Sequence, residues 1–438
     1  MIDERVLKRQ CQEVAIKEFH RLVAKHDQDM IPIMKQRGYT YVQSTERTVT
    51  LTFGEIRFRR RRWRKGSHWV TPVDEYLGLE SYVRYSKEFL YQVAELATMM
   101  PYAKVVYTVW LTYNVHITKS TVVKAVKLAR QLLEEREDYR FFEEKEVPQK
   151  QAVDIIYIEG DGVMVKARHE ETENRHFDLS HFMVHTGSQR AGGKRFALSG
   201  KKEFVTLSNR LTRDQVLDYL YNHFDITDKT LLITNSDGGH GYTPYVFKEM
   251  AKALGIKHHE HFWDECHVNK QLISTFKPYG RELLDLAFQA IQTHDKGKLR
   301  MAFETAESLE ESSDRLETLV SVKKQYLANF QYTLSAEMRG LPPAGIGVME
   351  SQHRKITYRM KKRGMYWTFW GAETMAQLIV MLYEGNLREL FFGDWREKYQ
   401  SISQGSDNSR PREKQSAKDY FPEHRRPWSR DYQRSIRY

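Results

Sequence analysis

Apolar residues in the first part of the chain recur at two spacings, and the change of spacing predicts where helix gives way to strand. Within residues 6–26 they recur at helical spacing among charges, which predicts one or two short amphipathic helices. Over residues 48–58 they alternate with polar residues, and Gly54-Glu55 can turn the chain, so this stretch predicts a β-hairpin. We therefore expect an N-terminal helical segment over 1–47 and a hairpin region over 48–86.

Three helical patterns follow, and the last two predict a helix-turn-helix. Residues 87–99 carry apolar side chains on one face, Pro101 can open a second helix, and Thr118 or Ser120 can cap a third. A tight break joins the second and third helices, so 87–147 is expected to be a helix-turn-helix DNA-binding domain. Helix pairs of this kind also occur in proteins that never touch DNA. The third helix would present Lys119, Thr121, Lys124 and Lys127 to a major groove.

The pattern becomes α/β from residue 148. Short apolar strands are predicted around 153–159, 162–168, 180–186, 204–207, 230–234 and 258–262, with helices over 212–224 and 243–254. Residues 268–340 show only helical spacing among many acids, which predicts a helical insertion between 148–267 and the helices of 341–399. Residues 400–438 are rich in Ser, Gln, Asn, Pro and Arg, which predicts a disordered basic tail. The charged stretch 134–150 is interpreted as a linker.

Length and charge narrow the class of protein. A chain of 438 residues is long enough for two to four domains, and its net charge of +11 favours a polyanionic partner, nucleic acid or an anionic membrane surface. A basic protein without such a partner is the alternative. Cys11 and Cys266 are the only cysteines, which excludes a disulfide framework and a Cys-x-x-Cys zinc ribbon and favours a reducing, intracellular location. No apolar run approaches the roughly 20 residues that a membrane span needs.

Two basic runs are candidate nucleic-acid contacts. The first continues the second hairpin strand and encloses a tryptophan, which suits phosphate contacts and base stacking. A solvated basic edge that blocks strand pairing is the alternative interpretation. The predicted contacts are Arg57, Arg59, Arg60, Arg61, Arg62, Trp63 and Arg64 in the first run and Arg354, Lys355, Arg359, Lys361, Lys362 and Arg363 in the second.

Three carboxylates lie where predicted elements end or begin. Asp161 follows an apolar strand, Asp237 follows the buried run 230–234, and Glu350 opens a helix beyond the helical insertion. Asp161-Gly162 alone could simply be the turn of a two-residue hairpin. Together, however, the three suit phosphodiester chemistry on two metal ions. Mg²⁺ prefers oxygen ligands, and two neighbouring metal ions can act on both the attacking and the leaving oxygen.

Around these carboxylates the sequence resembles the DDE transposases of bacterial insertion sequences, nearest the ISLre group and more distantly the Mutator-type enzymes. The resemblance extends from about residue 48 to about residue 395. It implies an α/β RNase H-like catalytic core with an all-α insertion between Asp237 and Glu350, preceded by a small β-hairpin and a helix-turn-helix. Four stretches carry it: Tyr-Ile-Glu-Gly-Asp161-Gly-Val, Asn-Ser-Asp237-Gly-Gly, Phe-Trp-Asp264-Glu-Cys-His267-Val-Asn-Lys and Gly-Val-Met-Glu350-Ser-Gln-His-Arg.

The resemblance also implies roles for these residues. Asp161, Asp237 and Glu350 would be catalytic ligands of two Mg²⁺ ions, with Mn²⁺ as a substitute, and Asp264 and His267 would be a supporting catalytic pair. Taken alone, His267 is more simply interpreted as a core or capping histidine. The sequence departs from the family pattern at His240, which follows the second aspartate, and at residues 351–354, which follow the glutamate.

The function that the resemblance implies is DNA transposition. Such an enzyme binds the terminal inverted repeats of its element, cleaves at the ends by metal-dependent hydrolysis and joins the 3′-OH to target DNA. Its expected partners are double-stranded DNA and further copies of the same chain, without a membrane, in the bacterial cytoplasm on the nucleoid. Two alternatives are an inactive or repurposed DNA-binding protein and an RNase H-like nuclease without strand transfer.

Overall fold

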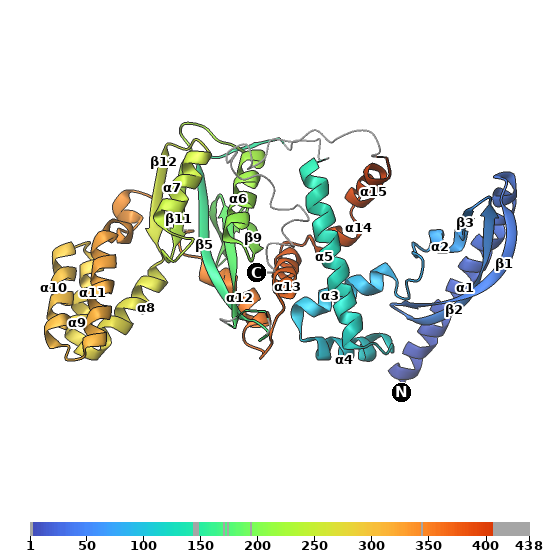
Figure 1. The fold of residues 1–438 in the computed structure, drawn as a ribbon, viewed down its shortest axis with the longest axis horizontal. Helices are drawn as coiled ribbons and strands as arrows, with labels where there is room; N and C mark the ends of the chain where they lie inside the picture. The colour runs from blue at the N-terminus through green and yellow to red at the C-terminus, as the bar shows by residue number, and fades with distance from the viewer. Residues whose placement is uncertain are drawn as a thin grey trace. The chain divides into compact units, whose positions relative to one another are not determined.

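The computed structural model describes residues 3–142, 149–169, 171–172, 175–192, 195–342 and 345–405, and it divides the chain into two compact units (Figure 1). Unit 1 comprises Met1–Arg140 and Met381–Arg410, and unit 2 comprises Phe141–Val380 and Pro411–Tyr438. The predicted tail from residue 406 onward and residues 143–148 of the predicted linker lie outside the described residues. Within the described ranges, no helix is long and apolar enough to cross a membrane.

Unit 1 begins with one long helix packed on a hairpin. The helix α1 (Glu4–Gln36) has 33 residues, so the prediction of one or two short helices within 6–26 is wrong; Pro32 lies inside the helix without ending it. Phe19 of α1 packs on the hairpin core. The hairpin itself is longer than predicted at both ends. Its elements are β1 (Thr40–Leu51), β2 (Gly54–Lys65) and the edge strand β3 (His68–Val70), followed by α2 (Pro72–Tyr76).

The helices of unit 1 follow the predicted pattern closely. Helix α3 (Lys87–Met99) has the predicted bounds, and Pro101 is the N-cap of α4 (Tyr102–Tyr113). Asn114 ends α4 in the left-handed conformation, with a φ of 54°. Helix α5 (Lys119–Phe142) continues into the predicted linker. The unit is completed by α14 (Leu387–Phe392) and α15 (Trp395–Gly405), so residues 400–405 are helical where disorder was predicted.

A five-stranded mixed sheet organises unit 2, in the order β12-β11-β5-β6-β9. The strands β5, β11 and β12 are parallel, whereas β6 is antiparallel to β5 and β9 is antiparallel to β6. A hairpin of β7 (Gly187–Gly192) and β8 (Arg195–Ser199), which the sequence did not predict, precedes β9. The sheet strands are β5 (Ile155–Lys166), β6 (His176–His185), β9 (Lys202–Thr206), β11 (Leu231–Ser236) and β12 (His258–Trp263), and β4 (Gln151–Ala152) pairs with β10 (Phe224–Asp225).

The strand β5 runs straight through Asp161-Gly162, so the alternative interpretation of this dipeptide as a hairpin turn is wrong. Neighbouring β11 pairs with β5 only as far as Gly160, whereas β6 pairs with β5 up to Lys166. Gly160 allows close packing rather than a turn, because a Cβ there would lie 2.7 Å from the ring of Phe182. Asp161 is therefore the first residue of β5 beyond the end of β11.

Helices cover both faces of the sheet. On one face α6 (Asn209–His223) and α7 (Pro244–Ala253) pack over Ile156, Ile158 and their neighbours. On the other face α12 (Met349–Met360) packs against β5. The remaining elements are α13 (Phe369–Tyr383), and the helices of the predicted insertion, α8 (Glu265–Phe276), α9 (Arg281–Gln292), α10 (Lys296–Leu309) and α11 (Ser313–Ala328), with 3₁₀ turns η1 (Lys277–Tyr279), η2 (Phe330–Thr333) and η3 (Glu337–Arg339).

The helical pattern predicted over 268–340 is confirmed, and these helices have a core of their own. Phe276, Phe303 and Tyr326 are buried among them. Figure 1 shows α8 leaving the sheet directly after β12, with α9, α10 and α11 stacked beyond it (yellow to orange). The insertion thus returns the chain to the sheet at α12, which carries Glu350.

Candidate active site where the parallel strands end

Three aspartates meet at the edge where the parallel strands end. Asp161 lies just beyond the end of β11, Asp237 directly follows β11, and Asp264 directly follows β12. Parallel strands end at the same edge of a sheet, so their carboxyl ends bring these side chains together. Burial raises the pKa of Asp161 to about 7, and the negative charges of Asp237 and then Asp264 add to the rise. Asp161 and Asp237 are therefore close enough for the charge of one to act on the other.

Asp161 is held by its own strand and by α12. The backbone N–H of Gly162 donates to Asp161 Oδ1 at 2.7 Å, and His353 Nδ1 lies 3.5 Å from Asp161 Oδ2. His353 is itself buried and stacks on His181, with 5.1 Å between ring centroids. Burial lowers the pKa of His353 to about 3, so its ring is neutral at pH 7. His353, one of the residues 351–354 at which the sequence departs from the family pattern, is thus a direct neighbour of Asp161.

Asp237 lies in a tight loop after β11. The N–H of Gly239 donates to Asp237 Oδ1 at 2.8 Å. Gly238 has a φ of +76°, and a Cβ there would lie 3.0 Å from Trp263 Nε1, so a side chain at this position would be strained and crowded. Asp178 of β6, which the sequence did not single out, is also close: burial raises its pKa, and the charge of Asp237 raises it further.

The predicted supporting pair is in direct contact. Asp264 caps α8, and its Oδ1 accepts both the backbone N–H and the ring Nδ1–H of His267, each at 2.9 Å. Burial would raise the pKa of Asp264, but these two bonds outweigh it and the pKa is lowered. The bond to Asp264 raises the pKa of His267 against the effect of burial, and the charges of Asp161 and Asp237 raise it further. A protonated His267 is therefore favoured beside the aspartates.

Glu350 has different partners from the two aspartates. It accepts from the Cys266 thiol at 2.8 Å and from Lys270 Nζ at 3.1 Å, both on α8, and these bonds lower its pKa. Among the residues that the structure describes, no three His, Cys, Asp or Glu side chains form a group that could hold a metal ion. The oxygen donors of Asp161 and Asp237 suit a hard divalent cation, whereas Glu350 is held by Lys270.

The side chain of Glu159 on β5 holds the N-terminus of α12 against the sheet. Its side chain is only 1% exposed, and it accepts the backbone N–H groups of Gly347 and Met349 at 2.9 and 2.8 Å and that of Val348 at 3.3 Å. A carboxylate at a helix N-terminus satisfies amides that have no partner in the helix. Burial raises the pKa of Glu159 to about 8, and these three amides oppose the rise. The signal in the sequence was an acid inside an otherwise apolar strand.

Burial corrects the predicted DNA contacts of unit 1. Trp63 is only 2% exposed and Thr121 only 4%, so neither can stack on or bind a nucleic acid. Arg60 pairs with Asp74 at 2.8 Å and Arg61 with Asp27 at 2.5 Å, which gives both arginines an internal role. Exposed basic residues remain on β2 and α5: Arg57, which pairs with Glu46, and Arg59, Arg64, Lys119, Lys124 and Lys127, with Arg62 partly exposed.

The basic run of α12 divides in the same way. Lys355 pairs with the buried Glu203, and Arg359 is only 1% exposed, with its guanidinium 5.3 Å from the ring centroid of Trp367. These two residues were predicted to contact DNA, but the helical period places them on the buried face. Arg354, Lys361 and Lys362 are exposed, and Arg363 is partly buried over the Tyr358 ring.

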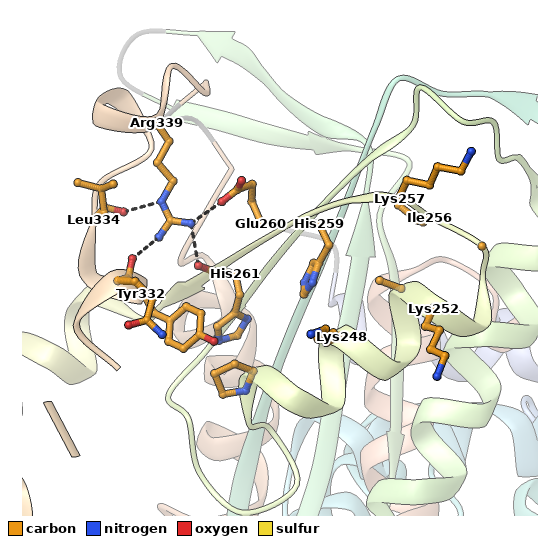
Figure 2. A pocket seen from close by; sticks show the side chains of 14 residues that line it. Lys248, Lys252, Ile256, Lys257, His259, Glu260, His261, Tyr332, Leu334 and Arg339 are labelled. Carbon is orange, nitrogen blue, oxygen red and sulfur yellow. Dashed lines mark hydrogen bonds and ion pairs between the residues drawn. The ribbon is translucent and has the colours of Figure 1, made fainter. Parts of the chain in front are cut away.

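A separate pocket of about 880 Å³ lies between α7, the edge strand β12 and residues 331–339 (Figure 2). Arg339 closes one side of it by donating to Glu260 Oε2 at 2.7 Å and to the His261 carbonyl at 3.0 Å. None of the predicted catalytic residues lines this pocket. The ion pair of Arg339 with Glu260 ties residues 331–339 to the edge strand β12, which suits a structural role for this region, so the aspartate cluster is the better candidate site.

Comparison with known proteins gives a family. A model of an uncharacterised protein family, UPF0236, matches residues 2–398. The chain belongs to UPF0236. A relative from Streptococcus gallolyticus, described as the UPF0236 protein in vanSb 3′ region, is 29% identical over 386 residues, covering 87% of this chain and 82% of the relative.

Among solved structures, a Drosophila P element transposase strand transfer complex matches this UPF0236 chain weakly. The TM-score is 0.24 at 10% identity, over 76% of this chain and 90% of the other. A similarity at this level carries no argument about fold or activity.

Proposed function

We propose that this UPF0236 protein is a DDE DNA transposase, similar to those of the ISLre insertion sequences, that binds terminal inverted repeats, cleaves at the element ends and joins the 3′-OH to target DNA. The observation that carries the proposal is the meeting of Asp161, Asp237 and the Asp264–His267 pair at the ends of three parallel strands. A partly buried, acid-rich edge of this kind suits catalysis on a charged phosphodiester more than it suits a structural role, because each neighbouring acid makes the others costlier to ionise.

The mixed sheet supports an RNase H-like core. Three parallel strands, extended on one side by two antiparallel ones, place the first two aspartates on adjacent strands. The helices α8–α11 then separate Asp237 from Glu350 in the chain, as the resemblance implies. The proposal therefore uses the sheet as a platform for residues that are far apart in sequence.

Asp161 and Asp237 would hold Mg²⁺, or Mn²⁺ in its place. Burial and, after it, the charge of Asp237 raise the pKa of Asp161, and a bound cation would relieve this because it favours both ionised carboxylates. Glu350 would join them after exchanging its bond with Lys270. A pair of such ions, when bound, promotes in-line displacement at phosphorus.

The chain's own residues would orient the substrate. Asp264 fixes the ring of His267 through Nδ1, which leaves Nε2 as the ring atom that can contact the scissile phosphate. The raised pKa of His267 favours the cationic ring, which would bind phosphate oxygen. Glu159 holds the first turn of α12 in place, and thereby the position of Glu350.

Exposed cations would supply DNA affinity. The cations that would contact backbone phosphates of double-stranded DNA are Lys119, Lys124 and Lys127 of α5, Arg354 in the middle of α12, and Lys361 and Lys362 directly after it. Affinity should therefore fall steeply with salt. A homo-oligomer would hold two element ends together, with one copy of the chain at each end.

A strand-transfer assay tests this proposal. Labelled duplex from the DNA that flanks the coding region is incubated with the protein, Mg²⁺ and a supercoiled plasmid. The proposal predicts cleaved ends and labelled plasmid. Cleavage without joining would indicate a nuclease, and binding without cleavage in Mg²⁺ or Mn²⁺ would indicate a repurposed DNA-binding protein; either result contradicts the proposal.

A further inference from the structure

The arginines of strand β2 fall into two groups that differ in what neutralises them. Arg57, Arg60 and Arg61 each pair with a carboxylate, from Glu46, Asp74 and Asp27 respectively. Within the described part of the chain, no ion pair joins Arg62 or Arg64 to any acid. Arg59, exposed in the middle of β2, likewise forms no ion pair within the described residues, so what sets Arg62 and Arg64 apart is the aromatic ring beside them.

An exposed tryptophan, Trp69, lies beside both Arg62 and Arg64. Trp69 of the edge strand β3 is directly opposite Arg64 in the sheet register and is 44% exposed. The guanidinium carbons of Arg62 and Arg64 lie 4.7 and 5.6 Å from its ring centroid. Arg64 Nε also donates to the Gly66 carbonyl at 2.6 Å in the turn between β2 and β3. Both guanidinium groups are therefore oriented without being neutralised.

The neighbouring lysine is arranged in the same way. Lys65 Nζ lies 5.8 Å from the ring centroid of Tyr39 and donates to the Arg37 carbonyl at 2.8 Å. Arg62, Arg64 and Lys65 thus contact rings or carbonyls and form no ion pair among the residues that the structure describes, which favours an anionic partner from outside the chain. Arginine placed over an aromatic ring can still present its outer N–H groups, whose planar fork suits phosphate oxygens.

We propose that Arg62, Arg64 and Trp69 form a contact site for the sugar-phosphate backbone of duplex DNA, in which Trp69 orients the two arginines. This replaces the predicted role of Trp63, which is buried. The inference rests on the proposed function, because it supposes that the polyanion is DNA. It adds to that function a specific contact at the end of the hairpin, far along the chain from the carboxylates.

Variants at this site have distinguishable effects on DNA affinity, measured with the full-length protein and a labelled duplex of arbitrary sequence at several salt concentrations. The salt slope is the steepness with which log affinity falls as log salt concentration rises. Trp69→Ala keeps the charge of the site, so we expect DNA affinity to fall about three- to tenfold while the salt slope stays unchanged. Trp69→Phe should restore most of the lost affinity. Arg64→Gln should lower the salt slope by about 1. The matched control Arg57→Gln, whose charge Glu46 already offsets, should lower it by less.

Two results would overturn the inference while leaving the proposed function intact. One is wild-type DNA affinity in Trp69→Ala; the other is an equal loss of salt slope in Arg57→Gln and Arg64→Gln, which would mean that only net charge matters. If the wild-type protein binds phosphatidylserine vesicles but no DNA, both the inference and the proposed function fail. Circular dichroism shows whether Trp69→Ala is folded, and Trp69→Phe and Arg64→Gln keep the test decisive if it is not.

Discussion

In unit 2, burial separates charged side chains that make internal contacts from charged side chains that face solvent. Lys355 and Arg359 carry the same charge as Arg354 on the same helix, yet the first two are turned into the protein and the third into solvent. His261 is buried beside Thr234, and its Nδ1 lies 2.8 Å from the hydroxyl oxygen. Residue type alone did not separate these roles, because helical phase and tertiary contacts set them.

Arg359 is expected to stabilise the fold rather than to bind DNA. Arg359→Ala should lower the free energy of unfolding by about 2 to 4 kcal/mol, because it empties a large buried volume against Trp367. Arg354→Ala, exposed on the same helix, should change it by less than about 0.5 kcal/mol. Urea unfolding followed by circular dichroism measures both. Equal small effects would contradict the internal role of Arg359.

His261 should make the protein sensitive to acid. Burial lowers its pKa to about 3 from 6.5, so the unfolded chain takes up a proton that the folded chain excludes. The contribution of a neutral His261 to the free energy of unfolding is fully present above pH 6.5. It is lost as the pH falls from 6.5 toward 3, by up to about 1.4 kcal/mol per pH unit.

The measurement is thermal unfolding of the wild type and His261→Gln at pH 7.5 and 5. We expect the variant to lose less stability between the two pH values than the wild type does. Other buried histidines give the wild type a residual slope, so the difference between the proteins is the quantity that matters. Parallel losses in both proteins would mean that His261 does not exclude the proton.

At the scale of elements, local patterns predicted most helices and strands of the core but not how they join. The bounds of α3 and the strands β11 and β12 followed from apolar spacing and end signals. The continuity of β5 did not, because Asp161-Gly162 is a strong local turn signal that pairing with β6 overrides. The capping of α12 by Glu159 joins residues 188 to 190 positions apart, which no local pattern reveals.

Glu159 should stabilise unit 2 through α12. Glu159→Ala leaves three backbone amides without their acceptor, that of Met349 buried and those of Gly347 and Val348 partly buried, and should cost about 3 to 5 kcal/mol. Glu159→Gln keeps one oxygen acceptor and should cost less. Hydrogen exchange of the first turn of α12 reports the effect directly, with α3 in unit 1 as an internal reference. Unchanged protection of the Met349 amide in Glu159→Ala would contradict the capping role.

At the scale of the whole molecule, strand ends and the family resemblance together predicted a shared site of Asp161, Asp237 and Glu350 beside Asp264 and His267. Asp161, Asp237 and the Asp264–His267 pair lie close enough for their charges to act on one another, whereas Glu350 accepts from Cys266 and Lys270. The sequence could not predict that Asp178 and His353 would join them, since β6 pairing and the placement of α12 bring these two in. Nor could it predict that Glu350 pairs with Lys270, because two adjacent helices set that contact.

The most direct test of the carboxylate site is Mg²⁺-dependent cleavage of duplex carrying the repeat ends, measured beside binding of the same duplex. Asp161→Asn, Asp237→Asn and Glu350→Gln each remove one charge while keeping the side-chain shape. We expect each to lower the cleavage rate by at least about a thousandfold and to leave DNA affinity within about threefold of the wild type. Wild-type cleavage in any of the three would contradict the assignment of that carboxylate to the active site.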